Sequence, residues 1–188
     1  MSSKLPLTLA AGDYESIRAL KEGTVKPDGI ELTILTDMTA EVRHRRMLRG
    51  RQFDVAELSM SNYMVAKDNG LPFIAIPVFL HRRFRHGFVF VNTARSVNKA
   101  AELIGKKVGV GSYHATANLW MRGILEHEFD LPHKQIRWFK EIDEKIPWQI
   151  PPGLSIAKVP SGKNIVDMLL AGELDAVIDP EVIQPIAT

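Results

Sequence analysis

Strand-like and helix-like segments alternate along most of the chain, and this alternation limits the folds that are open to it. In the first half, apolar runs rich in Val, Ile and Leu alternate with segments that a capping residue or a Gly bounds as helices. The expected strands are residues 5–11, 30–36, 53–58 and 73–79, and the expected helices are 14–22, 39–49 and 59–68. Repeats of this kind predict a parallel sheet with right-handed crossovers.

The alternation restarts after Asn92, which predicts a second unit of the same class. The expected helices are 97–104, 115–129 and 161–170, the last capped by Ser161, and the expected strands are 107–110, 136–139, 156–159 and 175–178. Residues 141–153 have no period and predict an irregular surface segment. We therefore predict an α/β fold with two lobes, residues 1–85 and residues 86–188. The second lobe is expected to begin with a crossover strand at 88–91.

Composition narrows the class of protein further. The hydrophobic fraction of 45% and the charged fraction of 24% are those of a globular protein, and a net charge of +2 does not predict nucleic-acid binding. The chain has no Cys, which excludes disulfides and thiolate chemistry. The N-terminal segment lacks a long apolar stretch, so we expect no signal peptide, no membrane span and a cytoplasmic location.

Residues 81–86 form a dense cationic segment between two apolar runs. This basic cluster consists of His81, Arg82, Arg83, Arg85 and His86. Charges packed so closely must be solvated, paired or directed at an anion. A solvated turn is one interpretation, and an anion-binding site is the other. The position of the cluster between two α/β halves favours the anion-binding site, in a cleft that the lobes share.

Polar residues follow the expected strands of the first half, where ligands of parallel sheets bind. Asp13 and Tyr14 follow the first strand, and Glu57 and Ser59 follow the third. Asp13 and Ser59 have helix capping as the alternative role. Glu57 interrupts a strand that should be buried on both faces, so it needs a cationic partner or a raised pKa. The arginines of residues 43–51 are interpreted as a mostly solvated helix face.

In the second half, the loop of residues 111–116 carries small and hydroxylated residues, including Tyr113 and Thr116. We expect it to present free N–H groups at the start of helix 115–129, which would form an anion site. A cap role for Thr116 alone is the alternative. Along the helix, Ala117, Met121, Ile124 and Leu125 form an apolar stripe, and Trp120 is expected in the core.

Several long motifs resemble the 4,5-dihydroxyphthalate decarboxylase family, within the type 2 periplasmic-binding-protein fold. They are GDYESIRAL at 12–20, FDVAELSMSNY at 53–63, IPVFLHRRFRHGFVFVN at 76–92, IGKKVGVGSYHATANLWMRGILEHEF at 104–129, EKIPWQIPPG at 144–153 and LLAGELDAVIDP at 169–180. The resemblance implies non-oxidative decarboxylation of a hydroxylated aromatic dicarboxylate without a cofactor. Family members continue beyond the last motif, so we expect the second lobe and its return segment to be incomplete.

The site roles follow from arene decarboxylation as a hypothesis. Arg82 and Arg85 would bind the two carboxylates, and His86 is the first candidate for the general acid. Glu57 would pair with an arginine or accept the phenolic proton. The remaining candidates would bind or orient the substrate, and they are Asp13, Tyr14, Ser59, Tyr113 and Thr116.

Other classes of site and of protein are considered beside this hypothesis. The histidines lack the spacing of a metal motif, and no phosphate-binding loop occurs. The expected partner is a small aromatic dicarboxylate, with no metal, nucleic acid or membrane, and a homo-oligomer is compatible with the sequence. The alternatives are a non-catalytic binder or sensor of an aromatic acid, and an inactive truncated relative.

Overall fold

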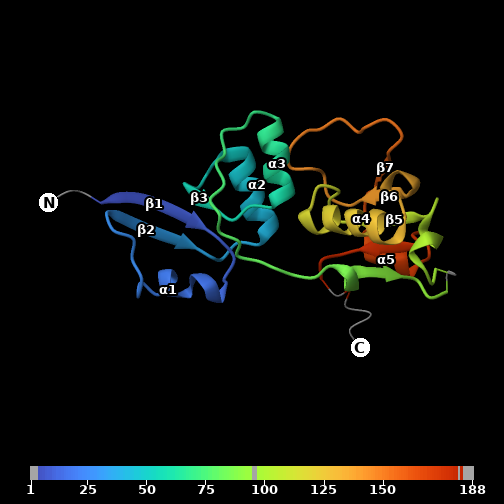
Figure 1. The fold of residues 1–188 in the computed structure, drawn as a ribbon, viewed down its shortest axis with the longest axis horizontal. Coiled ribbons are helices and arrows are strands. Elements are labelled where there is room, and N and C mark those ends of the chain that lie inside the picture. The colour runs from blue at the N-terminus through green and yellow to red at the C-terminus, as the bar shows by residue number, and fades with distance from the viewer. Residues whose placement is uncertain (1–3, 95–96, 182, 184–188) are drawn as a thin grey trace. The chain divides into compact units, whose positions relative to one another are not determined.

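Two separate sheets form the framework of the chain in a computed structural model, which describes residues 4–94, 97–181 and 183 (Figure 1). The chain divides into two compact units, residues 1–82 and residues 83–188. The first unit holds a three-stranded sheet of order β2-β1-β3, and the second holds a five-stranded sheet of order β4-β8-β5-β6-β7. Adjacent strands are parallel except for the antiparallel pair β4–β8. The predicted α/β class is thus confirmed, and the domain boundary at residue 85 stays a prediction.

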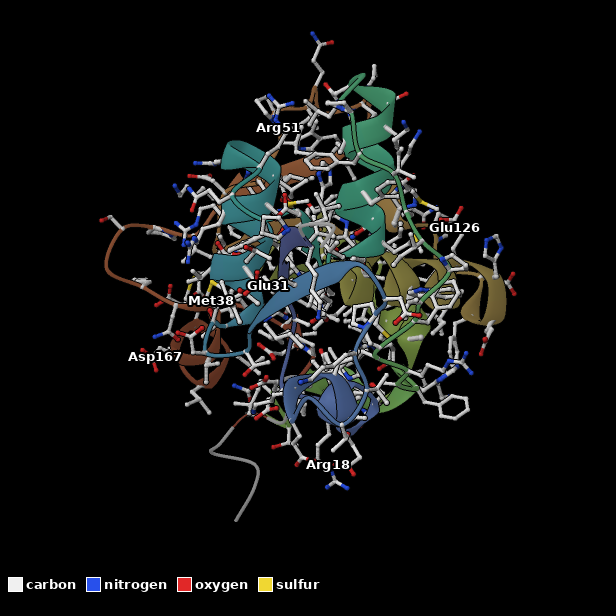
Figure 2. The ribbon with its side chains drawn as sticks, turned by 90° about the vertical axis from the view of Figure 1, so that its left-hand side faces the viewer. Arg18, Glu31, Met38, Arg51, Glu126 and Asp167 are labelled. Atoms are coloured by element: carbon white, nitrogen blue, oxygen red, sulfur yellow. The ribbon has the colours of Figure 1, made fainter. Side chains whose placement is uncertain are left out.

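The first unit combines its three-stranded sheet with helices. Its strands are β1 (Leu5–Ala10), β2 (Ile30–Leu35) and β3 (Val55–Ala56), and its helices are α1 (Arg18–Lys21), α2 (Ala40–Gly50) and α3 (Met60–Asp68), with a 3-10 turn at Glu15–Ile17. Thr39 begins α2, because its hydroxyl accepts from the Val42 N–H at 3.4 Å. Arg51 ends α2 in the left-handed conformation, with φ 46° (Figure 2).

The second unit has the larger of the two sheets. Its strands are β4 (Val89–Val91), β5 (Lys107–Val110), β6 (Arg137–Lys140), β7 (Ser155–Lys158) and β8 (Ala176–Ile178), and its helices are α4 (Thr116–Phe129) and α5 (Ile165–Leu170), with 3-10 turns at His86–Phe88, Ala100–Leu103 and His133–Gln135. Nothing regular forms in residues 141–153, as predicted. Among the described residues, no helix is long and apolar enough to cross a membrane.

The core of the second unit lies on both faces of its sheet. On one face, Met121 and Leu125 of α4 pack with Val108, Val110 and Trp138. On the other face, α5 packs against side chains of alternate strand positions, among them Val177 and Phe139. Successive strand residues point to opposite faces, so β4, β6 and β8 each contribute to both clusters. The predicted apolar stripe of α4 is confirmed by the burial of Ala117, Met121 and Leu125.

The expected fourth strand, residues 73–79, is not a strand in the structure. Ile74 is 92% exposed and Phe79 is 61% exposed, although both are apolar. The Phe73 and Val78 N–H groups bond to the carbonyls of Leu71 and Ile76, two residues back, instead of to a neighbouring strand. Strand propensity alone does not make a strand, because the ladder needs a partner edge.

Two further local predictions are wrong. Trp120 is 63% exposed and lies outside the core, because it falls beside the buried stripe of α4 and not within it. Helix α5 begins later than expected, and Asn164 caps it in place of Ser161. The Asn164 side chain accepts from the Asp167 N–H at 2.8 Å.

Candidate functional site

The first sheet changes its winding direction between β1 and β3. The chain passes from β1 to β2 on one side and then crosses to β3 on the other side of β1. The segments after β1 and β3 follow the carboxyl ends of two adjacent parallel strands where the strand order reverses, and ligands of open α/β sheets bind at such points. Gly12, Tyr14 and Glu57, which follow these two strands, come together there.

Glu57 is the centre of this group. Its Oε2 accepts from the Gly12 N–H at 2.9 Å and from the Arg43 Nη2 at 2.6 Å, and its Oε1 accepts from the Tyr14 hydroxyl at 2.8 Å. The Arg43 side chain is 2% exposed and also donates to the Met38 carbonyl at 2.9 Å. Met38 lies in the turn that leads into α2 (Figure 2). The predicted need of Glu57 for a cationic partner is confirmed, and the partner is Arg43.

The Tyr14 ring lies directly over the backbone of Gly12. A Cβ atom at Gly12 would be 2.7 Å from two carbons of that ring, which is closer than side chains tolerate. The ring centroid of Tyr14 is 5.9 Å from that of His81, the first residue of the basic cluster. Glycine at position 12 is therefore part of what fixes the ring.

The other candidates of the first unit include Asp13 and Ser59, which contact residues other than Glu57. Asp13 pairs with Lys21 at 2.8 Å and does not cap the first helix. Ser59 is the N-cap residue of α3, where its hydroxyl accepts from the Asn62 side chain at 3.1 Å. Arg82 is exposed. Roles for these three residues in substrate binding stay predictions.

The second sheet has the same kind of winding change between β5 and β8. The connection through α4 leads from β5 to β6 on one side, whereas the connection through α5 brings the chain back to β8 on the other side of β5. The loop of residues 111–116 and the segment from Asp179 follow these two strands. Burial raises the pKa of the Asp179 carboxyl, the hydrogen bond from the Glu181 N–H opposes that shift, and the charges of the Glu181 and Glu141 carboxylates add to it.

The loop before α4 binds an anionic side chain, the carboxylate of Glu144. Its carboxylate accepts from the Ser112 hydroxyl at 2.8 Å, from the Tyr113 N–H at 2.8 Å and from the His114 N–H at 3.1 Å. The N–H groups of Tyr113 and His114 are therefore occupied, and the expected anion site at the start of the helix stays a prediction. Glu144 comes from the irregular segment 141–153, and the two N–H groups that it binds precede Ala115, the N-cap residue of α4.

Tyr113 is enclosed by charged and aromatic groups. The Arg122 guanidinium lies 3.7 Å from the ring centroid and donates to the Tyr113 carbonyl at 2.7 Å. Trp148 stacks on the ring at 5.7 Å between centroids and is 4.4 Å from the His114 ring. Burial raises the pKa of Tyr113, and burial lowers the pKa of Arg122. Tyr113 is thus buried in the described structure.

His86 and Arg85 lie where the second unit begins. The His86 Nε2 is 3.4 Å from a carboxylate oxygen of Glu128, and about half of each side chain is exposed. Arg85 is partly buried, and burial together with Arg83 lowers the pKa of its guanidinium. Thr116 is the first residue of α4 and is partly exposed. The roles of His86, Arg85 and Thr116 in a substrate site stay predictions.

Sequence reasoning missed Arg43 and the pair His114–Glu144. The sequence groups Arg43 with the arginines of a solvated helix face, yet Arg43 lies four residues before Met47, a partly buried apolar residue of α2. That spacing was the available signal. Nothing local marks Glu144, because its partners lie about thirty residues away along the chain. Among the described residues, no group of three potential metal ligands occurs.

Comparison with known proteins gives first the class and then the family. The chain has the fold of the alkanesulfonate-binding protein SsuA from Xanthomonas axonopodis pv. citri, with a TM-score of 0.56 and 12% identity over 95% of this chain and 55% of that one. This places it in the periplasmic-binding-protein-like fold class. No model of a protein family matches the chain.

Two curated relatives are more informative. The chain is 38% identical to a 4,5-dihydroxyphthalate decarboxylase from Comamonas testosteroni and 37% identical to one from Pseudomonas putida, in each case over 185 residues and 95% of this chain. It spans 56% of the length of the first relative and 71% of the second. The chain belongs to the 4,5-dihydroxyphthalate decarboxylase family.

Proposed function

We propose that this protein catalyses the non-oxidative decarboxylation of a hydroxylated aromatic dicarboxylate such as 4,5-dihydroxyphthalate. The observation that carries the proposal is the 38% and 37% identity to two proteins of that name across 95% of the chain. The SsuA likeness supports the fold alone, because a fold of this class hosts many functions.

The reaction replaces one ring carboxylate by a proton. The ring carbon takes up a proton, its bond to the carboxylate breaks, and the bonding electrons return to the ring as CO2 leaves. In 4,5-dihydroxyphthalate each carboxylated carbon has a hydroxyl group para to it, which donates electrons to the ring as aromaticity is lost. The product is a catechol-type monocarboxylic acid. The protein must therefore bind two carboxylates, supply one proton and hold the ring.

The described residues are assigned to these tasks as part of the proposal. Arg82 and Arg85 bind carboxylates, because guanidinium groups match them with paired hydrogen bonds. His86 supplies the proton, and its neighbour Glu128 orients the imidazole. Glu57 is assigned a supporting role, since Arg43, Tyr14 and Gly12 already occupy its carboxylate.

The direct test is to incubate the purified chain with 4,5-dihydroxyphthalate and to measure CO2 and the monocarboxylate. Release of both in equal amounts, with His86→Asn retaining substrate affinity and losing turnover, is the expected result. Binding in calorimetry without CO2 would indicate a binder or sensor instead. If neither binding nor CO2 is seen, the proposed activity of this chain is rejected.

The setting of the reaction is also part of the proposal. A cytoplasmic location, a small aromatic dicarboxylate as the partner and a possible assembly of identical chains stay predictions. Cell fractionation with an antibody to the protein tests the location, and light scattering of the purified chain tests the assembly.

A further inference from the structure

The position of the Tyr14 phenol is fixed from several directions. Its hydroxyl donates to Glu57 at 2.8 Å, and Gly12 leaves room for the ring to lie against the backbone. Glu57 is held in turn by Arg43 at 2.6 Å and by the Gly12 N–H at 2.9 Å. These contacts connect the segments after β1 and β3 to α2, at the carboxyl end of the sheet.

Arg43, which holds Glu57, is unusual because it is a charged side chain that is buried. Its side chain is 2% exposed, so its charge has been withdrawn from water. A buried ion pair gives little net stability, because desolvation offsets the attraction of the charges. What such a pair does supply is a fixed geometry, since a guanidinium reaches a carboxylate and a carbonyl at the same time from set directions. Here those acceptors are Glu57 and the Met38 carbonyl.

We propose that Arg43 is a positioning residue that acts through Glu57 to hold Tyr14 as the contact for the aromatic ring of the ligand. The partly exposed Tyr14 ring and the neighbouring His81 ring, 5.9 Å apart, form the aromatic surface. Such a surface suits a planar arene. The ligand class rests on the proposed function, whereas the positioning role rests on the contacts alone.

The first test needs no ligand. The protein has three tyrosines, so ring signals from 13C-labelled tyrosine can be assigned with Tyr14→Phe, Tyr63→Phe and Tyr113→Phe. Arg43→Lys is expected to shift and broaden the Tyr14 signals and to leave those of Tyr113 in place. A lysine ammonium cannot reproduce the forked contact to two acceptors. Arg45→Lys is the matched control, because Arg45 lies on the same helix and is exposed.

Glu57→Gln serves as a second variant if Arg43→Lys does not fold, since it keeps the shape of the side chain and removes its charge. Movement of the Tyr14 signals in either variant, with none in Arg45→Lys, supports the proposal. Tyr14 signals that stay unchanged in the folded variants overturn it.

The second test measures the affinity for 4,5-dihydroxyphthalate by calorimetry. Arg43→Lys and Tyr14→Phe are each expected to weaken binding about tenfold, and the double variant is expected to bind about as weakly as either single variant. If the double variant binds about a hundredfold more weakly, as two independent tenfold effects would give, the positioning role is overturned, even if CO2 is released. Coupled effects in a protein that releases no CO2 support the positioning role and count against the proposed reaction only.

Discussion

At the scale of single residues, the buried ionisable side chains mark the places where folding removes a titratable group from water. His114 lies beside the Glu144 carboxylate, 3.6 Å from its oxygen, and against the Trp148 ring. Burial lowers the pKa of His114 below its ordinary 6.5, while Glu144 opposes that shift and Arg122 and Lys140 add to it. The imidazole is therefore neutral in the folded protein at neutral pH.

This arrangement predicts a loss of stability in acid. Below about pH 6.5, His114 takes up a proton in the unfolded chain but stays neutral to lower pH in the folded chain. The unfolded state then binds more protons, so the free energy of unfolding decreases as the pH is lowered. We expect His114→Gln to reduce the difference in unfolding free energy between about pH 7.5 and about pH 5.5, measured in urea. His127→Gln, an exposed change on the same helix, is the control. If the unfolding free energy changes equally between the two pH values in wild type and in His114→Gln, the prediction is contradicted.

Arg85 allows a second prediction at this scale. If its guanidinium binds a substrate carboxylate, Arg85→Ala should weaken the binding of 4,5-dihydroxyphthalate by about 2 kcal/mol or more, the usual loss when one member of a desolvated charge pair is removed. Calorimetry measures this change. Arg137→Ala is the control, because Arg137 is an exposed arginine of the same unit. Affinity that Arg85→Ala leaves unaltered would remove Arg85 from the site.

At the scale of elements, the packing of β5 against α5 requires a glycine at position 109. A Cβ atom at Gly109 would be 2.7 Å from the Leu174 Cδ1 and 3.0 Å from the Ile165 Cγ2. Gly109→Ala should therefore overpack the contact with α5 and lower the free energy of unfolding by about 1–3 kcal/mol in denaturant titrations. Gly111→Ala is the matched control, because a Cβ there would meet nothing within 4 Å. A smaller effect at Gly109 than at Gly111 would refute this account of the packing.

The elements that could be predicted from the sequence are those whose signals are local. The prediction of β5 as residues 107–110 matches its observed bounds, and α2 begins at the cap that Thr39 predicts. Residues 73–79 carry the same apolar signal as β5 and form no strand, because pairing depends on a partner that local sequence does not specify. The candidate site residues likewise include some that local sequence predicts and some that it does not. The need of Glu57 for a cation was predictable, whereas the contacts of Glu144 depend on how distant segments fold.

At the scale of the whole molecule, the two units differ in how much apolar surface they bury. Both large clusters of buried apolar side chains found in the described residues belong to residues 83–188. The sheet of residues 1–82 contains the two-residue strand β3 and has several partly exposed strand positions. Because burial of apolar area is the main source of folding free energy, the second unit should be the more stable one.

We therefore expect residues 83–188, produced alone, to keep the slowly exchanging amides of β5, β6 and β8, and residues 1–82 alone to exchange quickly throughout. Hydrogen exchange read by NMR measures this residue by residue, with the whole chain as the reference. The parallel pairs of β5 with β6 and β8 lie wholly inside the second unit, so cutting before Arg83 removes none of their hydrogen bonds. If the isolated second unit loses protection at these strands, its stability depends on the first unit. The two compact units would then form one cooperative folding unit.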